Sequence, residues 1–175
     1  MGLDYLNLDE ITRASMADQV QRDIADGSLY VSARLNPLGI REWPDLLLSA
    51  VETGNDDSLA AEVVSRDLLK SHEESQRNGK PYTKKVPSTA AVTLAEGEFN
   101  RFYLRGIAAR AVDEGREVEI YRGRESASPR SESQDLVGKR LAGADLLNDL
   151  RSDVRVDGAL NLPPGPNSGL TGKLV

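Results

Sequence analysis

Over most of the chain the hydrophobic residues recur every three or four positions, and this spacing predicts α-helices. The first helix is expected to run from Asp9, whose side chain can cap its amino end, to Asp26, with Gly27 ending it. Its apolar positions fall close to one stripe, formed by Leu8, Ile11, Met16, Val20 and Ile24. The chain is therefore expected to open with a helix that buries one face.

Further helices follow with the same spacing. A short one has Pro44 in its first turn, where the missing N–H of proline does no harm. Longer helices are predicted over residues 57–76, ended by Asn78-Gly79, and over residues 93–114, ended by Gly115. Helices are thus expected to dominate the fold.

Alternation of apolar and polar residues predicts two short strands. The first covers residues 29–35 and is stopped by Asn36-Pro37. The second covers residues 117–121, with Val118 and Ile120 on one face. Polar loops are expected over residues 80–88 and 125–135. One last short helix is expected over residues 143–153.

The last fifteen residues carry three prolines and three glycines, so they are not expected to form a helix or a central strand. They also hold more apolar side chains than a solvated tail needs, namely Leu162, Leu170, Leu174 and Val175. We expect residues 156–175 to be an extended arm that docks on a neighbouring subunit, the alternative being a frayed terminus. The predicted fold class is mainly α: a helical bundle over residues 8–155, with a strand or hairpin excursion near 117–135, followed by this arm.

Residues 97–111 read GEFNRFYLRGIAARA and raise the question of whether this helix grips nucleic acid or packs against protein. Phe99 and Tyr103 are neighbours four residues apart on one face. Gly106 and Ala109 form a notch of small residues, and Gly97 a second one, through which another helix can approach closely. Because a glycine inside a helix costs about 1 kcal/mol relative to alanine, we interpret the helix as a packing element.

The arginines of this helix do not form one stripe. At about 100° per residue, Arg101 and Arg105 lie on one face and Arg110 lies opposite Arg101. We expect Arg101 and Arg105 to reach a carboxylate or a phosphate, with Glu98 placed for an ion pair with Arg101.

Charge is unevenly distributed in this chain, whose net charge is −6. Residues 1–60 hold eleven acids and four bases, whereas residues 81–130 hold nine bases and seven acids. Arg122, Arg124 and Arg130 fall on a strand end and a loop, where we expect them to pair with acids of a neighbouring subunit. Sequence-blind contact with DNA phosphates is the alternative for these arginines.

Residues with the chemistry of a catalytic or metal site are sparse. The chain has no cysteine and one histidine, His72, and it lacks nucleotide-binding glycine motifs; GLTGK near its end does not have the spacing of a phosphate loop. Asp113, Glu117 and Glu119 imitate a metal nuclease, but Tyr121 stands where its lysine should be. We therefore expect no enzyme activity, no catalytic residue, no cofactor and no metal, and no apolar run is long enough to span a membrane.

Three stretches, AEGEFNRFYLRGIAARAVDEG, VEIYRGRESASPRSES and LPPGPNSGL, resemble uncharacterised proteins of tailed bacteriophages and prophages that are found among virion morphogenesis genes. Within that class the architecture resembles a head–tail connector, or adaptor, of the phage neck. The resemblance implies a structural virion protein, assembled in the host cytoplasm, that forms a ring of copies, commonly a dodecamer, beneath the portal. It implies the portal and other neck proteins as partners, with non-specific contact to packaged DNA as an option.

The chain departs from that pattern by its strand at 117–121 and its acidic first third. These departures leave open a stopper, a terminator or a capsid-decorating protein. A DNA-associated regulator or nuclease is the alternative from another class of function. It is disfavoured because neither the helix at 57–76 nor the one at 93–114 is basic enough for a recognition helix.

Overall fold

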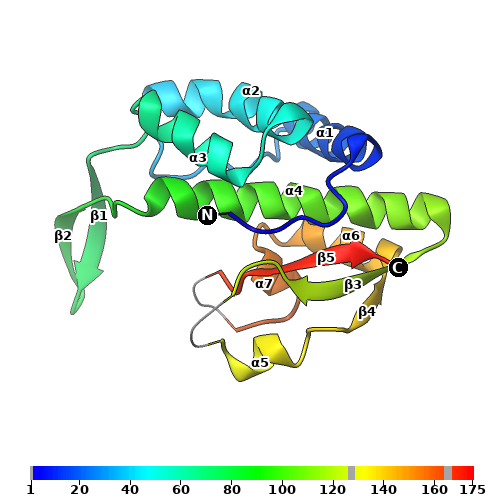
Figure 1. The fold of residues 1–175 in the computed structure, drawn as a ribbon. Helices are drawn as coiled ribbons and strands as arrows, with labels where there is room; N and C mark the ends of the chain where they lie inside the picture. The colour runs from blue at the N-terminus through cyan, green and yellow to red at the C-terminus, as the bar shows by residue number, and fades with distance from the viewer. Residues whose placement is uncertain (1, 126–128, 164–166) are drawn as a thin grey trace.

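A computed structural model describes residues 2–125, 129–163 and 167–175 (Figure 1). The helices in these ranges are α1 (Glu10–Ala25), α2 (Pro37–Thr53), α3 (Asp56–Ser65), α4 (Ala90–Glu114), α5 (Ser131–Gln134), α6 (Gly143–Ser152) and α7 (Val156–Ala159). The strands are β1 (His72–Arg77), β2 (Lys80–Lys85), β3 (Glu117–Arg122), β4 (Arg140–Ala142) and β5 (Leu170–Leu174). The predicted mainly α fold with short strands is confirmed.

Helix α4 forms the centre of the molecule. Helices α1, α2 and α3 cover one side of it, and the small sheet with α6 and α7 covers the other (Figure 1). Side chains on every face of its middle turns are buried, among them Phe99, Phe102, Leu104 and Ile107. A helix enclosed on all sides needs no amphipathic stripe, and the prediction that it is a packing element is confirmed.

The N-terminal helix begins and ends as its sequence predicts. Asp9 caps α1 by accepting a hydrogen bond from the Thr12 backbone N–H at 2.9 Å, and Gly27 follows the helix with a φ of 66°. Met16 and Val20 of the predicted stripe are buried, whereas Ile11 and Ile24 are exposed.

The predicted strand at 29–35 does not form. Leu35 makes only an isolated bridge to Leu69, and Asn36 caps α2 by accepting a hydrogen bond from the Gly39 N–H at 2.8 Å. Pro37 is the first residue of α2, so Asn36-Pro37 begins a helix rather than ending a strand. Pro44 consequently lies inside α2 and not in its first turn.

The last residues of the predicted helix at 57–76, and most of the loop predicted at 80–88, form a β-hairpin instead. Helix α3 ends at Ser65, and Asp67 then adopts a left-handed φ of 52°. Strands β1 and β2 pair with Arg77 opposite Lys80. Asn78 and Gly79 connect them with positive φ of 52° and 74°. Asn-Gly with both φ values positive is the favoured two-residue hairpin turn, and the sequence reading mistook it for a helix terminator.

The structure also corrects the extended C-terminal arm. Residues 170–174 are β5, an edge strand antiparallel to β3 in a sheet of order β4-β3-β5. Leu162, Leu170 and Leu174 are buried in their own chain's core, and Val175 pairs with Glu117 through backbone hydrogen bonds. The prolines all precede this strand, so they do not interrupt its pairing. The leucines that suggested a docking arm thus cover α4 and β3 of the same molecule.

Candidate functional site

Gly106 and Gly97, the two glycines predicted to pack against another helix, have different surroundings. A Cβ on Gly106 would lie 2.6 Å from Met16 Cγ and 3.2 Å from the Thr12 carbonyl oxygen, so α1 passes α4 at this point and the prediction is confirmed. Among the described residues, a Cβ on Gly97 would meet only Asn167 Nδ2, at 3.9 Å. Gly97 is therefore not a notch for another of the helices described.

The aromatic pair of α4 is packed as predicted, around a partner from the N-terminal segment. Phe99 and Tyr103 are fully buried, and the ring of Tyr5 lies 5.1 Å and 4.7 Å from their centroids. Ala109, which the sequence reading placed in the notch with Gly106, is half-buried.

Arg101 and Arg105 face neither DNA nor another subunit. Arg105 is 1% exposed, and its guanidinium donates to both Asp23 oxygens at 2.7 and 2.8 Å and to Gln19 Oε1. Arg101 donates to Glu98 at 2.9 Å. Both guanidinium groups also lie over the Phe102 ring. From the sequence, Arg101 and Arg105 are expected to reach a carboxylate or a phosphate, and they bind carboxylates. These carboxylates belong to the same chain and are buried with the arginines.

The three arginines after β3 also find partners within the molecule. Arg122 donates to the Ser168 carbonyl at 2.7 Å and to Ser133 Oγ at 3.1 Å. Arg124 binds both oxygens of Glu96, and Arg130 donates to the Pro163 carbonyl and to Asp157. Together they fasten the end of β3 and the residues just before α5 to α4 and to the C-terminal segment. Within the described residues these arginines bond to their own chain, and the expected contacts with a neighbouring subunit or with DNA stay a prediction.

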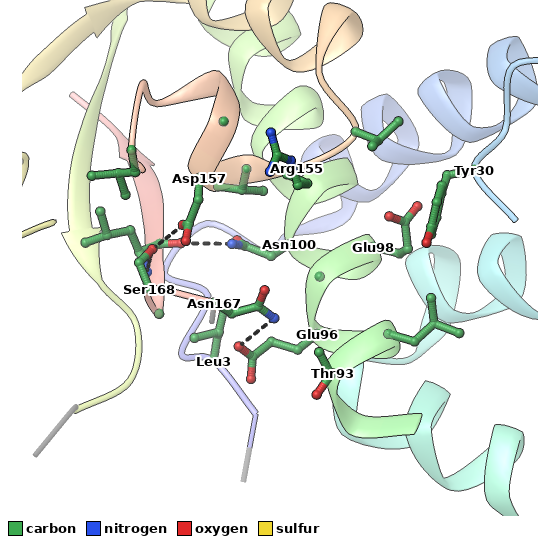
Figure 2. A pocket seen from close by; sticks show the side chains of 18 of the residues that line it. Leu3, Tyr30, Thr93, Glu96, Glu98, Asn100, Arg155, Asp157, Asn167 and Ser168 are labelled. Atoms are coloured by element: carbon green, nitrogen blue, oxygen red, sulfur yellow. Dashed lines mark hydrogen bonds between the residues drawn. The ribbon is translucent and has the colours of Figure 1, made fainter. Parts of the chain in front are cut away.

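A cavity of about 330 Å³ lies on the side of α4 that Gly97 faces. Its walls come from the N-terminal segment, α4, the region of α7 and the C-terminal segment (Figure 2). The apolar part of the lining includes Leu94, Val156 and Leu162. Tyr30 and Val154, which also line it, are exposed.

Hydrogen-bond acceptors dominate the buried polar lining of this cavity. Glu96, Glu98 and Asn100 project from α4 and are each at least 94% buried. Asn100 donates to the Leu170 carbonyl at 2.8 Å, while its Oδ1 has no hydrogen-bond partner among the described residues. Burial raises the pKa of Glu98 to about 7, although Arg101 and Arg105 act in the opposite direction. Asp157, hydrogen-bonded to Ser168, adds a third carboxylate (Figure 2).

The β1–β2 hairpin, residues 72–85, is the most exposed element. It projects past the amino end of α4 (Figure 1), and every residue of β2 is exposed. It holds four basic and two acidic residues, which leaves the rest of the chain with a net charge of −8. Its base is tied to the body by Arg34, which binds Glu73 at 2.6 Å and also lines the cavity.

The register divides the hairpin side chains between two faces. Glu73 pairs with Lys84, Ser75 with Tyr82, and Arg77 with Lys80 on one of them. This face, which we call the basic face, therefore displays three cations around one exposed tyrosine. The other face carries His72, Glu74, Gln76, Pro81, Thr83 and Lys85.

Glu119, one of the acids that resembled a nuclease motif, is used in surface ion pairs. Glu119 lies 2.9 Å from Lys173 and 3.5 Å from Arg140 on the strands beside it. His72 is exposed next to Ser71, and GLTGK forms β5 rather than a phosphate loop. Within the described ranges, no three His, Cys, Asp or Glu side chains are grouped so as to hold a metal ion. None of the helices described has the length and hydrophobicity of a membrane span.

The sequence reading missed both the hairpin and the cavity. The hairpin had a signal in Asn78-Gly79, whereas the cavity is lined by segments far apart in the chain and had none. Comparison of the chain with protein-family models, with curated proteins and with solved structures finds no match.

Proposed function

We propose that this chain is a structural assembly subunit and that its projecting hairpin attaches it to a neighbouring copy. The observation that carries the proposal is the hairpin itself, because a two-stranded hairpin without a hydrophobic face is marginally stable alone. Its exposed strands and its tyrosine are features that interfaces use. Its positive charge complements the body, whose net charge is −8.

Among assemblies, the phage head–tail connector ring is the one that the sequence resemblance favours. A head-to-tail contact, in which the hairpin of one copy binds the body of the next, produces a closed ring when the rotation between copies closes. In this proposal the ring joins the portal and other neck proteins in the virion. Contact with packaged DNA would then be non-specific.

The test removes the hairpin and leaves its base. Glu73 and Lys84 face each other across the hairpin, so residues 74–83 can be replaced by Asn-Gly, which closes the same kind of turn and keeps the bond between Arg34 and Glu73. We expect the wild-type chain to form a defined oligomer in light scattering or native mass spectrometry, and the shortened chain to be a folded monomer. The control carries His72→Ala and Gln76→Ala on the other face and should still assemble.

Two results would contradict the proposal. One is a wild-type chain that stays monomeric at all concentrations and with extracts of its source. The other is a shortened chain that assembles like the wild type. If the wild-type chain instead binds duplex DNA, with an affinity that falls steeply with salt and is lost with the hairpin, a DNA-associated function is favoured.

A further inference from the structure

The cavity around Gly97 has the size and the lining of a receptor for side chains. Its volume of about 330 Å³ lies in the range of small-ligand sites. Gly97 contributes to this space, since no atom of the described residues lies closer than 3.9 Å to the position where its Cβ would stand. Tyr30 and Val154 leave apolar surface exposed beside it.

The polar lining asks for an occupant that donates hydrogen bonds. The carboxylates of Glu96, Glu98 and Asp157 are already bonded to arginines of the same chain, whereas Asn100 Oδ1 has no partner in the described part of the chain. A buried acceptor without a donor costs free energy. Arg34 and Arg155 also line the cavity, but each is paired with a carboxylate, Glu73 and Asp153 respectively. An apolar group that carries a hydroxyl donor therefore fits this lining.

The basic face of the hairpin offers that combination. Tyr82 presents an aromatic ring with a terminal hydroxyl, and Lys80 and Lys84 flank it on the same face. All three side chains are exposed in the single chain. The tyrosine ring suits the apolar part of the cavity, and its hydroxyl is a donor for the unpaired Asn100 Oδ1.

We propose that the cavity around Gly97 receives Tyr82 from the hairpin of a second copy of this chain. The inference rests on the proposed function and adds to it the surface that the hairpin binds. Tyr82 lies in the cavity as the anchor, and its hydroxyl donates a hydrogen bond to Asn100 Oδ1. The hairpin gains the apolar contact that it lacks in the single chain.

Filling the cavity tests the proposal without disturbing the fold. Gly97→Leu places a side chain in open space and replaces a helical glycine, so the variant should keep or raise its melting temperature. We expect Gly97→Leu and Tyr82→Ala each to weaken self-association at least tenfold, and the double variant to be no weaker than either. An equimolar mixture of the two single variants should form a complex of two chains, because one retains the cavity and the other the tyrosine.

Cross-linking gives an independent readout, because the chain has no cysteine of its own. Tyr82→Cys combined with Thr93→Cys, at the lining of the cavity, should form disulfide-linked multimers under mild oxidation. The matched control combines Tyr82→Cys with Val112→Cys, an exposed position near the other end of α4, and should stay uncross-linked.

Assembly that survives Gly97→Leu but not loss of the hairpin would overturn this inference and leave the proposed function standing. Equal cross-linking through Thr93→Cys and Val112→Cys would overturn it as well. If the wild-type chain does not self-associate, both proposals fail together.

Discussion

Arg105 illustrates how single residues decide whether a charge is available for a partner. From the sequence, Arg105 is expected to bind a carboxylate or a phosphate. Asp23, 82 residues away, provides the carboxylate. Truncating one member of such a buried pair is costly because the other charge remains buried without compensation. The arginines of α4 therefore hold α1 to α4, and the surface chemistry is left to other residues.

The two glycines of α4 should respond to alanine with opposite signs. Gly106→Ala forces Cβ to within 2.6 Å of Met16 Cγ and near the backbone of α1, so we expect a loss of roughly 1–3 kcal/mol. Gly97→Ala meets nothing closer than 3.9 Å and should gain up to about 1 kcal/mol from helix propensity. Urea denaturation of the pair measures both changes. Equal effects of the two substitutions would refute the close crossing at Gly106.

Glu98 should make the fold less stable as the pH rises. In the folded chain its pKa is about 7, against an ordinary value of 4.5. Between these values the folded state holds a proton that the unfolded state has released, so stability decreases from about pH 5 to pH 8. A shift of this size corresponds to a decrease on the order of 3 kcal/mol.

Glu98→Gln tests this assignment, because the amide stays neutral throughout. The groups facing Glu98 are Arg101, Arg105 and Asp23, and the variant leaves them in place. Its free energy of unfolding, measured from pH 5 to 8, should vary less than that of the wild type. An unchanged slope would assign the pH dependence to another group, such as Asp56, whose pKa burial also raises.

At the scale of elements, local signals predicted some segments well and misled for others. The cap at Asp9, the left-handed Gly115 and the alternation around Val118 set the bounds of α1, α4 and β3 to within a few residues. The hairpin was missed because its strands are polar on both faces, so neither shows a hydrophobic period of two. Pairing, not the pattern of either segment alone, makes them strands.

The turn of the hairpin should be sensitive to β-branched residues. Gly79 has a φ of 74°, which valine adopts only with strain. Gly79→Val should therefore disorder the hairpin and reduce self-association while the melting temperature of the body stays within about 2 °C, given the small shift expected when the core is untouched. Circular dichroism and light scattering on one sample measure both. Asn78→Asp, which keeps a residue that tolerates positive φ, is the matched control.

At the scale of the whole molecule, contacts between distant segments determine what the sequence could not reveal. The cavity combines residues from Leu3 to Leu170, and β5 joins β3 only after the chain has returned across α4. Asn7 Oδ1 accepts a hydrogen bond from the Leu174 N–H on the outer edge of β5. In the sequence, apolar residues near a chain end are compatible with a docking arm and with an edge strand. Only the packing of the folded chain distinguishes the two.

Truncation after Leu160 should consequently unfold the chain. It removes Leu162, Leu170 and Leu174 from the core, a loss of roughly 5–9 kcal/mol at about 1.5–3 kcal/mol per side chain. This loss is comparable to the whole stability of an ordinary domain, about 5–15 kcal/mol, so we expect the cooperative transition to be weakened or lost. Thermal melting followed by circular dichroism should show a broad transition or none. A truncated chain that melts like the parent would restore the docking-arm hypothesis.

Because α4 lies between the other layers, its amides should exchange with solvent more slowly than those of the hairpin. Amides in its middle turns, around Phe102, are covered on every side and can exchange with solvent deuterium only when the whole body opens. Amides of the hairpin are protected by one pairing of exposed strands and can exchange through a local opening that leaves the body intact. In an assembled particle the same hairpin amides should slow by orders of magnitude while those of α4 do not change. Exchange rates along one chain would thus report which copies are engaged with a neighbour.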